Sequence, residues 1–86
     1  MKQTTGKVRV INRQRAMVGV YVEQEDDHTV LKLSSVNDID IGDVMAWDSG
    51  TALGTQSYRN LTKGWTAEVY VAKHGVATAN LEVQLR

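Results

Sequence analysis

Two short stretches near the start of the chain decide the fold: GKVRVIN at residues 6–12 and MVGVYVEQ at residues 17–24. In the first stretch valines alternate with the basic residues Lys7 and Arg9, and in the second a valine occupies every other position. A spacing of two residues predicts β-strands that each turn one face toward a core. Gly19 lies on the opposite face of the second strand and predicts a bulge or a close approach to the backbone.

The same two-residue spacing recurs further along the chain. It predicts strands at residues 28–33, 65–72 and 81–86, with turns or loops between them. A turn at Gly42 and Asp43 predicts a further strand at residues 44–48. Residues 49–64 contain three glycines and short apolar islands, so we expect mostly loop there, with one short strand or helical turn. Lys73, His74 and Gly75 are expected to turn the chain, which makes residues 65–86 a C-terminal hairpin.

Together these segments predict one all-β domain over residues 1–86. Five or six short strands joined by short turns favour a small, OB-like antiparallel barrel over any helical fold. The residues that we expect to be buried are Val8, Val10, Val20, Leu31, Val44, Val69 and Val83. This list depends on the register, because a slip of one residue reverses every face of a strand.

The composition excludes several kinds of site. The chain has no cysteine, so it can form neither a disulfide nor a thiolate metal site, and it has no cysteine nucleophile. No apolar run is long enough to cross a bilayer, and residues 1–5 are too polar and too short for a signal peptide. We therefore expect a cytoplasmic protein.

The charges are unevenly distributed, although the net charge is zero. Residues 1–22 carry five basic residues and no acid, whereas residues 23–48 carry eight acids and one lysine, Lys32. Any affinity for a polyanion must therefore come from a local patch on the first two strands. A solvated strand face is the simpler interpretation of the same pattern.

The order of the predicted elements resembles that of the cold-shock domains. Residues 6–12 are similar to the family's first strand, Gly-Lys-Val-Lys-Trp-Phe-Asn, and residues 18–20 look like part of its second strand. Residues 30–36 look like the third strand, residues 41–43 sit where the family has a turn, and residues 54–61 are similar to its closing segment. The resemblance covers residues 6 to about 61 and implies an OB-like core that binds single-stranded RNA or DNA, while residues 65–86 have no counterpart.

One departure from the family bears on function. Cold-shock domains stack bases on aromatic side chains of their first three strands. The matching positions here hold aliphatic residues, and a lysine replaces the histidine: Val10, Ile11, Val18, Val20, Val30, Leu33 and Lys32. Stacking should therefore contribute little, so that contacts with phosphates must carry most of any binding.

The candidate nucleic-acid site combines the basic residues of the first strands with one aromatic residue. It consists of Lys7, Arg9, Arg13, Arg15, Tyr21 and Lys32, which we expect to converge around the tyrosine. Tyr21 faces away from the valine stripe and could stack a base, although a tyrosine at the edge of a barrel is equally ordinary. The other candidates for stacking are Trp47, Tyr58, Trp65 and Tyr70, of which Trp65 is expected in the core.

Four aspartates and the two histidines are interpreted as surface residues without a role in metal binding. Asp38, Asp40, Asp43 and Asp48 lack the spacing of a calcium loop and predict a solvated acidic rim. His28 and His74 lie beside predicted turns without a second ligand at metal spacing, so both are expected to be exposed.

The sequence is compatible with two functions. We expect no enzyme and no cofactor or metal, because the chain has no nucleophile–base pair and no phosphate-binding glycine loop. The first function is a nucleic-acid-binding module, and the second is a protein-interaction or structural module that uses an edge strand. A basic face around Tyr21 would favour the first, and a large exposed apolar patch would favour the second.

Overall fold

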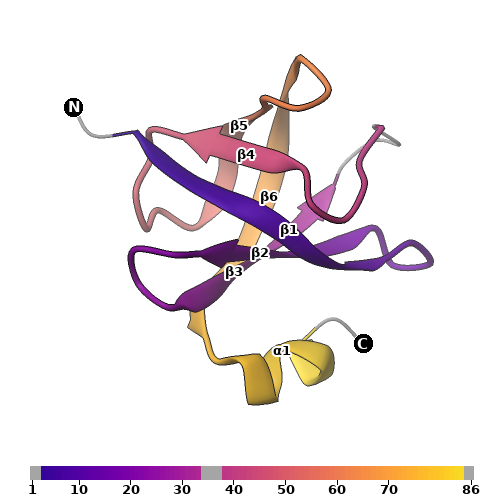
Figure 1. The fold of residues 1–86 in the computed structure, drawn as a ribbon, viewed down its shortest axis with the longest axis vertical. Helices are drawn as coiled ribbons and strands as arrows, with labels where there is room; N and C mark the ends of the chain where they lie inside the picture. Colours follow the sequence, from indigo (N-terminus) through magenta and orange to yellow (C-terminus); the bar gives the residue numbers. More distant parts are fainter. Residues whose placement is uncertain (1–2, 34–37, 85–86) are drawn as a thin grey trace.

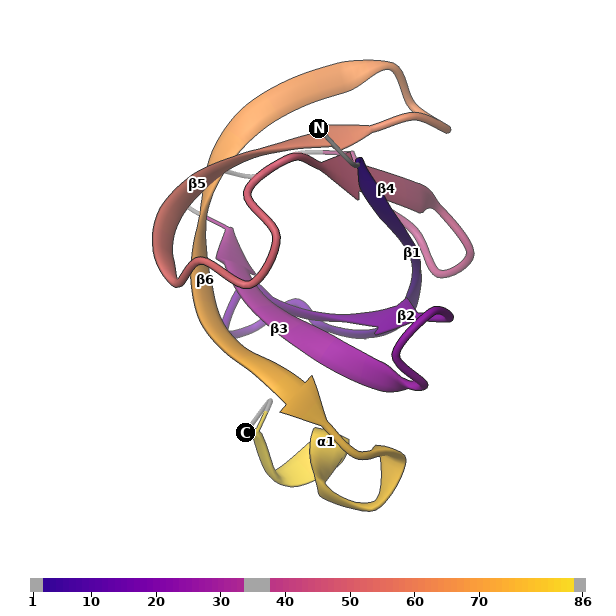
Figure 2. The same ribbon diagram turned by 90° about the vertical axis from the view of Figure 1, so that its left-hand side faces the viewer.

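A computed structural model describes residues 3–33 and 38–84, and these residues form six strands followed by a short helix (Figure 1). The elements are β1 (Thr4–Asn12), β2 (Met17–Val22), β3 (Asp27–Leu33), β4 (Val44–Trp47), β5 (Gly54–Asn60), β6 (Trp65–Val76) and α1 (Thr78–Gln84). The strands close into an antiparallel barrel in the order β1-β2-β3-β6-β5-β4, with β4 pairing back to β1. Figure 2 shows the strands curving around one interior, with α1 outside it. The prediction of a small, all-β, OB-like barrel is confirmed.

The interior of the barrel is filled by side chains from all six strands. It contains Val8, Val18, Val20, Val22, Leu31, Leu33, Ile39, Met45, Trp47, Tyr58, Val69 and Val71. The rings of Trp47 and Tyr58 stack inside it, with centroids 4.5 Å apart. The alternation of valines in β2, and of Leu31 and Leu33 in β3, thus predicted the inward faces of these strands correctly.

A bulge in β1 changes the environment of Val10. Val8 pairs with Val20, but Val10 pairs with Gly19, so β1 carries one extra residue, Arg9. The extra residue reverses the faces that follow it, and Val10 is half-buried against α1 outside the barrel instead of inside it. Val44 is also only half-buried.

The C-terminal segment is a helix, which corrects the prediction of a strand at residues 81–86; residues 85 and 86 lie outside the described part of the chain. Leu81 packs with Val30 and Val76 on the outer face of the sheet, whereas Val83 is 55% exposed instead of buried. The barrel is already closed by the pairing of β4 with β1, so its closure does not need a strand at residues 81–86. A helix instead places one leucine on the sheet.

The strand expected within residues 49–64 is present as β5, whereas the turn expected at residues 73–75 is wrong. β5 occupies seven residues of the predicted loop and pairs with β6 along its whole length. The predicted turn at Lys73, His74 and Gly75 lies inside β6, where two shifts of register against β3 and a positive φ of 68° at Gly75 absorb the irregular sequence. The predicted C-terminal hairpin is therefore one long strand followed by a helix.

Candidate nucleic-acid interface

Lys7, Arg9 and Tyr21 meet on the outer face of β1 and β2. Lys7 is paired directly with Tyr21 across the two strands, so their side chains share one face. The guanidinium carbon of Arg9 lies 4.3 Å from the centroid of the Tyr21 ring, which is a cation–π contact. An open groove passes beside these three residues and is also lined by Thr5, Gly6, Glu23, Gln24 and Val44. The structure therefore brings together half of the predicted site.

The Tyr21 ring is held in place from several sides. Its hydroxyl donates a hydrogen bond to Asp26 Oδ1 at 2.7 Å, and its ring lies 5.3 Å from that of His28. The hydrogen bond to the carboxylate raises the pKa of Tyr21 above its ordinary value, so the phenol stays protonated at neutral pH. Arg9 covers one face of the ring, and both residues line the groove.

The other predicted residues lie at the opposite end of the strands. Asn12 pairs with Met17, and Met17 pairs with Lys32, four residues along β2 from Tyr21. At the rise of a strand this is a separation of about 13 Å. Arg15 lies in the β1–β2 turn, where its backbone N–H donates to Asn12 Oδ1. Arg13, Arg15 and Lys32 therefore do not join Tyr21 in one site.

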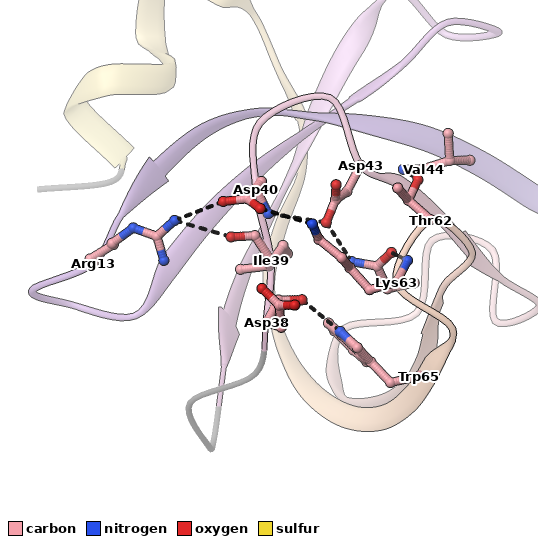
Figure 3. Close-up of polar contacts among 10 residues, drawn as sticks. Arg13, Asp38, Ile39, Asp40, Asp43, Val44, Thr62, Lys63 and Trp65 are labelled. Atoms are coloured by element: carbon pink, nitrogen blue, oxygen red, sulfur yellow. Dashed lines mark hydrogen bonds and ion pairs between the residues drawn. The ribbon is translucent and has the colours of Figure 1, made fainter.

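Arg13 instead belongs to a polar network that ties the β3–β4 loop to the β5–β6 turn (Figure 3). It donates to the carbonyl oxygen of Ile39 at 3.1 Å and contacts Asp40 at 3.4 Å. Lys63 Nζ donates to the other oxygen of Asp40 at 2.9 Å. The hydrogen bond from Lys63 and its positive charge lower the pKa of Asp40. The same hydrogen bond and the negative charge of Asp40 raise the pKa of Lys63.

Asp43 is the buried centre of this network, which corrects the prediction of a wholly solvated rim. Its carboxylate accepts hydrogen bonds from Asn60 Nδ2 at 2.9 Å and from the Asp40 N–H at 3.0 Å. Trp65, half-buried, donates from Nε1 to the carbonyl oxygen of Asp38 at 2.7 Å. The aspartates thus order the loop, and the described residues contain no group of three His, Asp or Glu side chains that could hold a metal ion.

The two histidines hold β6 in place and are not the exposed turn residues that we expected. His28 is completely buried, and because a carbonyl only accepts, its Nδ1 carries the proton in the 3.0 Å bond to the carbonyl oxygen of Val76. His74 is half-buried between Thr29 Oγ1, at 2.9 Å, and the carbonyl oxygen of Ala52, at 3.3 Å. Both predictions were wrong because β6 continues past the expected turn, so that it includes His74 and pairs with β3 at His28.

The remaining aromatic residues divide between the core and the surface. Trp47 and Tyr58 are buried, whereas Tyr70 on β6 is 54% exposed. Lys32 lies directly opposite Tyr70 in the β3–β6 pair. The alternation within β6 puts Tyr70 on the outer face, but the sequence alone does not pair it with Lys32.

No helix among the described residues is long and apolar enough to span a membrane. Comparisons with models of known protein families, with curated proteins and with solved structures find no match for this chain.

Proposed function

We propose that this barrel is a small binding module that holds single-stranded nucleic acid in the groove beside β1 and β2. The observation that carries the proposal is the Arg9–Tyr21 stack at the wall of an open groove, with Lys7 beside it. An aromatic ring and two cations supply what a single strand needs, a surface for a base and charges for its phosphates. A distant relationship to the cold-shock domains and a cytoplasmic location belong to the same proposal.

The residues that line the groove predict a weak affinity for single-stranded nucleic acid. Lys7 and Arg9 can neutralise about two phosphates, which corresponds to a slope of log K against log salt of roughly −1.4 for a single strand. Glu23 lines the same groove and opposes binding of a polyanion. Because the matching positions of β1 to β3 are aliphatic, the Arg9–Tyr21 stack offers the groove's one aromatic surface for a base.

A chemical-shift titration with a mixed-sequence single strand at low salt tests this proposal. Signals of residues 5–9 and 21–24 should move, and Arg9→Ala should abolish the shifts. Arg15→Ala is the matched control, because it removes an equal charge from the turn at the far end of the same strands. The proposal fails if the groove signals stay in place at millimolar oligonucleotide, or if the two variants bind equally.

A protein-interaction module is the second candidate, and the β5 edge favours it. Within the described residues β5 pairs with β4 only at Arg59 and Asn60, although it pairs with β6 at seven positions. An open groove lined by Asp48, Ser49, Gln56, Ser57 and Arg59 lies where β4 and β5 separate. An extended peptide can add to such an edge through its backbone. Fast amide exchange on the β4 side of residues 54–57, compared with slow exchange at Arg59 and Asn60, would show that the edge is available.

A further inference from the structure

Tyr70 is the aromatic side chain that the fold leaves most open to solvent. The chain has five aromatic residues, all of them described, and Tyr70 is the one that is more than half exposed. Within the described part of the chain its ring makes no contact with another ring or with a cation, unlike the Tyr21 ring, which Arg9 covers. The exposed part of the Tyr70 ring is therefore available to a flat ligand.

Two lysines flank this ring on the outer face of the sheet. Lys32 is the direct cross-strand partner of Tyr70, which places their Cβ atoms about 5 Å apart. Lys73 lies opposite Val30, two residues from Lys32 along β3, and both lysines are exposed. Glu68 lies two residues before Tyr70 on the same strand face and is the acidic boundary of this surface.

We propose that Tyr70, Lys32 and Lys73 form a second contact site for the nucleic-acid strand that binds at Tyr21, an inference that rests on the proposed function. One base stacks on the open ring of Tyr70, and its neighbouring phosphates contact the two lysines. Such a combination of a basic surface with an exposed ring is the pattern of sequence-tolerant single-strand binding. The charge of the lysines favours this ligand over a neutral peptide.

The positions of the two sites determine how a strand can reach both. Tyr21 of β2 pairs with His28 of β3, and Tyr70 of β6 pairs with Lys32 of β3. His28 and Lys32 are four residues apart along β3, and β3 lies between β2 and β6. From the spacings of a sheet, the two tyrosines are about 16 Å apart. Between the two tyrosines, Leu81 of α1 packs on Gly19 and Val30. The bound nucleic acid must therefore pass beside the helix. A short oligonucleotide occupies one site, and a longer one joins both.

Titration with an oligothymidylate of about 12 nucleotides, within the site sizes known for this kind of barrel, tests the inference. The ring protons of Tyr70 and the signals of Lys32 and Lys73 should shift together with those of Arg9 and Tyr21. Tyr70→Ala should weaken binding of this oligonucleotide roughly 5-fold or more, the lower end of the loss expected for one stacked base. Tyr70→Phe, which keeps the ring, is the matched control and should bind like the original protein. Unchanged near-ultraviolet circular dichroism from the buried Trp47–Tyr58 stack would show that each variant is folded.

The possible failures are distinguishable. If the oligonucleotide shifts the Arg9 and Tyr21 signals while Tyr70→Ala binds equally well, the second site is refuted and the proposed function stands. That result would show that the exposed ring does not take part in binding nucleic acid. If no signal moves anywhere, the proposed function is refuted together with the inference.

Discussion

Single residues decide the fit of the helix on the barrel, and Gly19 is the main example. A Cβ at this position would lie 2.8 Å from Leu81 Cδ1 and 3.3 Å from Leu81 Cγ. The sequence predicted a close approach at Gly19, and the structure shows that the approaching group is the leucine of α1. Sequence spacing could not identify that group, because residues 81–86 have the alternation of a strand.

Gly19→Ala should destabilise the protein by about 1 kcal/mol, at the low end for overpacking, because the helix can shift by a few tenths of an ångström. The same substitution should cost nearly nothing in a Leu81→Ala background, where the space above residue 19 is empty. Equilibrium urea unfolding of both single variants and the double variant measures the coupling. Additive effects would show that Leu81 does not rest on Gly19.

The contribution of Asp40 and Lys63 to the stability of the fold depends on pH. The folded-state pKa of Asp40 is lowered by Lys63, so this carboxylate stabilises the fold above its ordinary pKa, and the contribution is lost as the pH falls through the folded value. Lys63 has a raised pKa, so its contribution is present below its ordinary pKa and is lost as the pH rises through the folded value. The pair therefore acts between these two limits.

Lys63→Gln should move the pKa of Asp40 back up toward its ordinary value. A carboxyl-carbon NMR titration of Asp40 measures this change directly. Lys73→Gln serves as the control, because Lys73 is on the far side of the barrel sheet and makes no ion pair among the described residues. Equal titration curves for Asp40 in both variants would contradict the prediction.

At the scale of elements, the sequence predicted the bounds of the strands that contain valine and left those of β5 undefined. β1, β2, β3 and the start of β6 lie within one or two residues of the prediction because their apolar residues alternate, and β4 does so because a turn precedes it. β5 has the sequence GTQSYRN, in which only Tyr58 and Asn60 are buried, so no alternation of apolar residues marks it. Its pairing with β6 is decided by the closure of the barrel, which is a long-range property.

The candidate site follows the same division. Lys7, Arg9 and Tyr21 were grouped correctly because neighbouring strands of a hairpin share an outer face. Arg13 and Arg15 follow β1 at the hairpin turn, and the register of the strands carries them away from Tyr21. The sequence predicts Tyr70 as a candidate for stacking but does not place it next to Lys32. The reason is that β3 pairs with β6, and β4 and β5 lie between these two strands in the sequence.

The helix α1 is an element that should detach by itself. Seven residues are too few for a stable isolated helix, and among the described side chains of α1 only Leu81 is buried. Leu81→Ala should therefore cost about 2 kcal/mol and release the helix. Hydrogen exchange should accelerate in α1 while the amides of β1 to β5 stay protected. Val83→Ala, on the exposed side, is the control, and loss of protection throughout the barrel would contradict this separation.

At the scale of the whole molecule, one interior joins all six strands, so the barrel should unfold as a unit. Tyr58 lies at its centre, stacked on Trp47, and its hydroxyl has no hydrogen-bond partner among the described residues. A buried hydroxyl without a partner costs about 1 to 3 kcal/mol. Removing it should stabilise the entire barrel and not just β5.

Tyr58→Phe should accordingly increase the free energy of unfolding by about 1 kcal/mol. The midpoint of urea unfolding should therefore rise, and the dependence of the unfolding free energy on urea concentration should not change. Burial raises the pKa of Tyr58 above its ordinary value of 10.0, so its contribution to stability is full below that value and is lost as the pH rises through the folded value. Phenylalanine does not ionise, and the advantage of the variant should therefore widen above pH 10.0. Tyr70→Phe, at an exposed position, is the matched control and should leave the midpoint at neutral pH unchanged. If Tyr58→Phe lowers the midpoint at neutral pH, the hydroxyl has a hydrogen-bond partner in the folded protein, and the prediction is wrong.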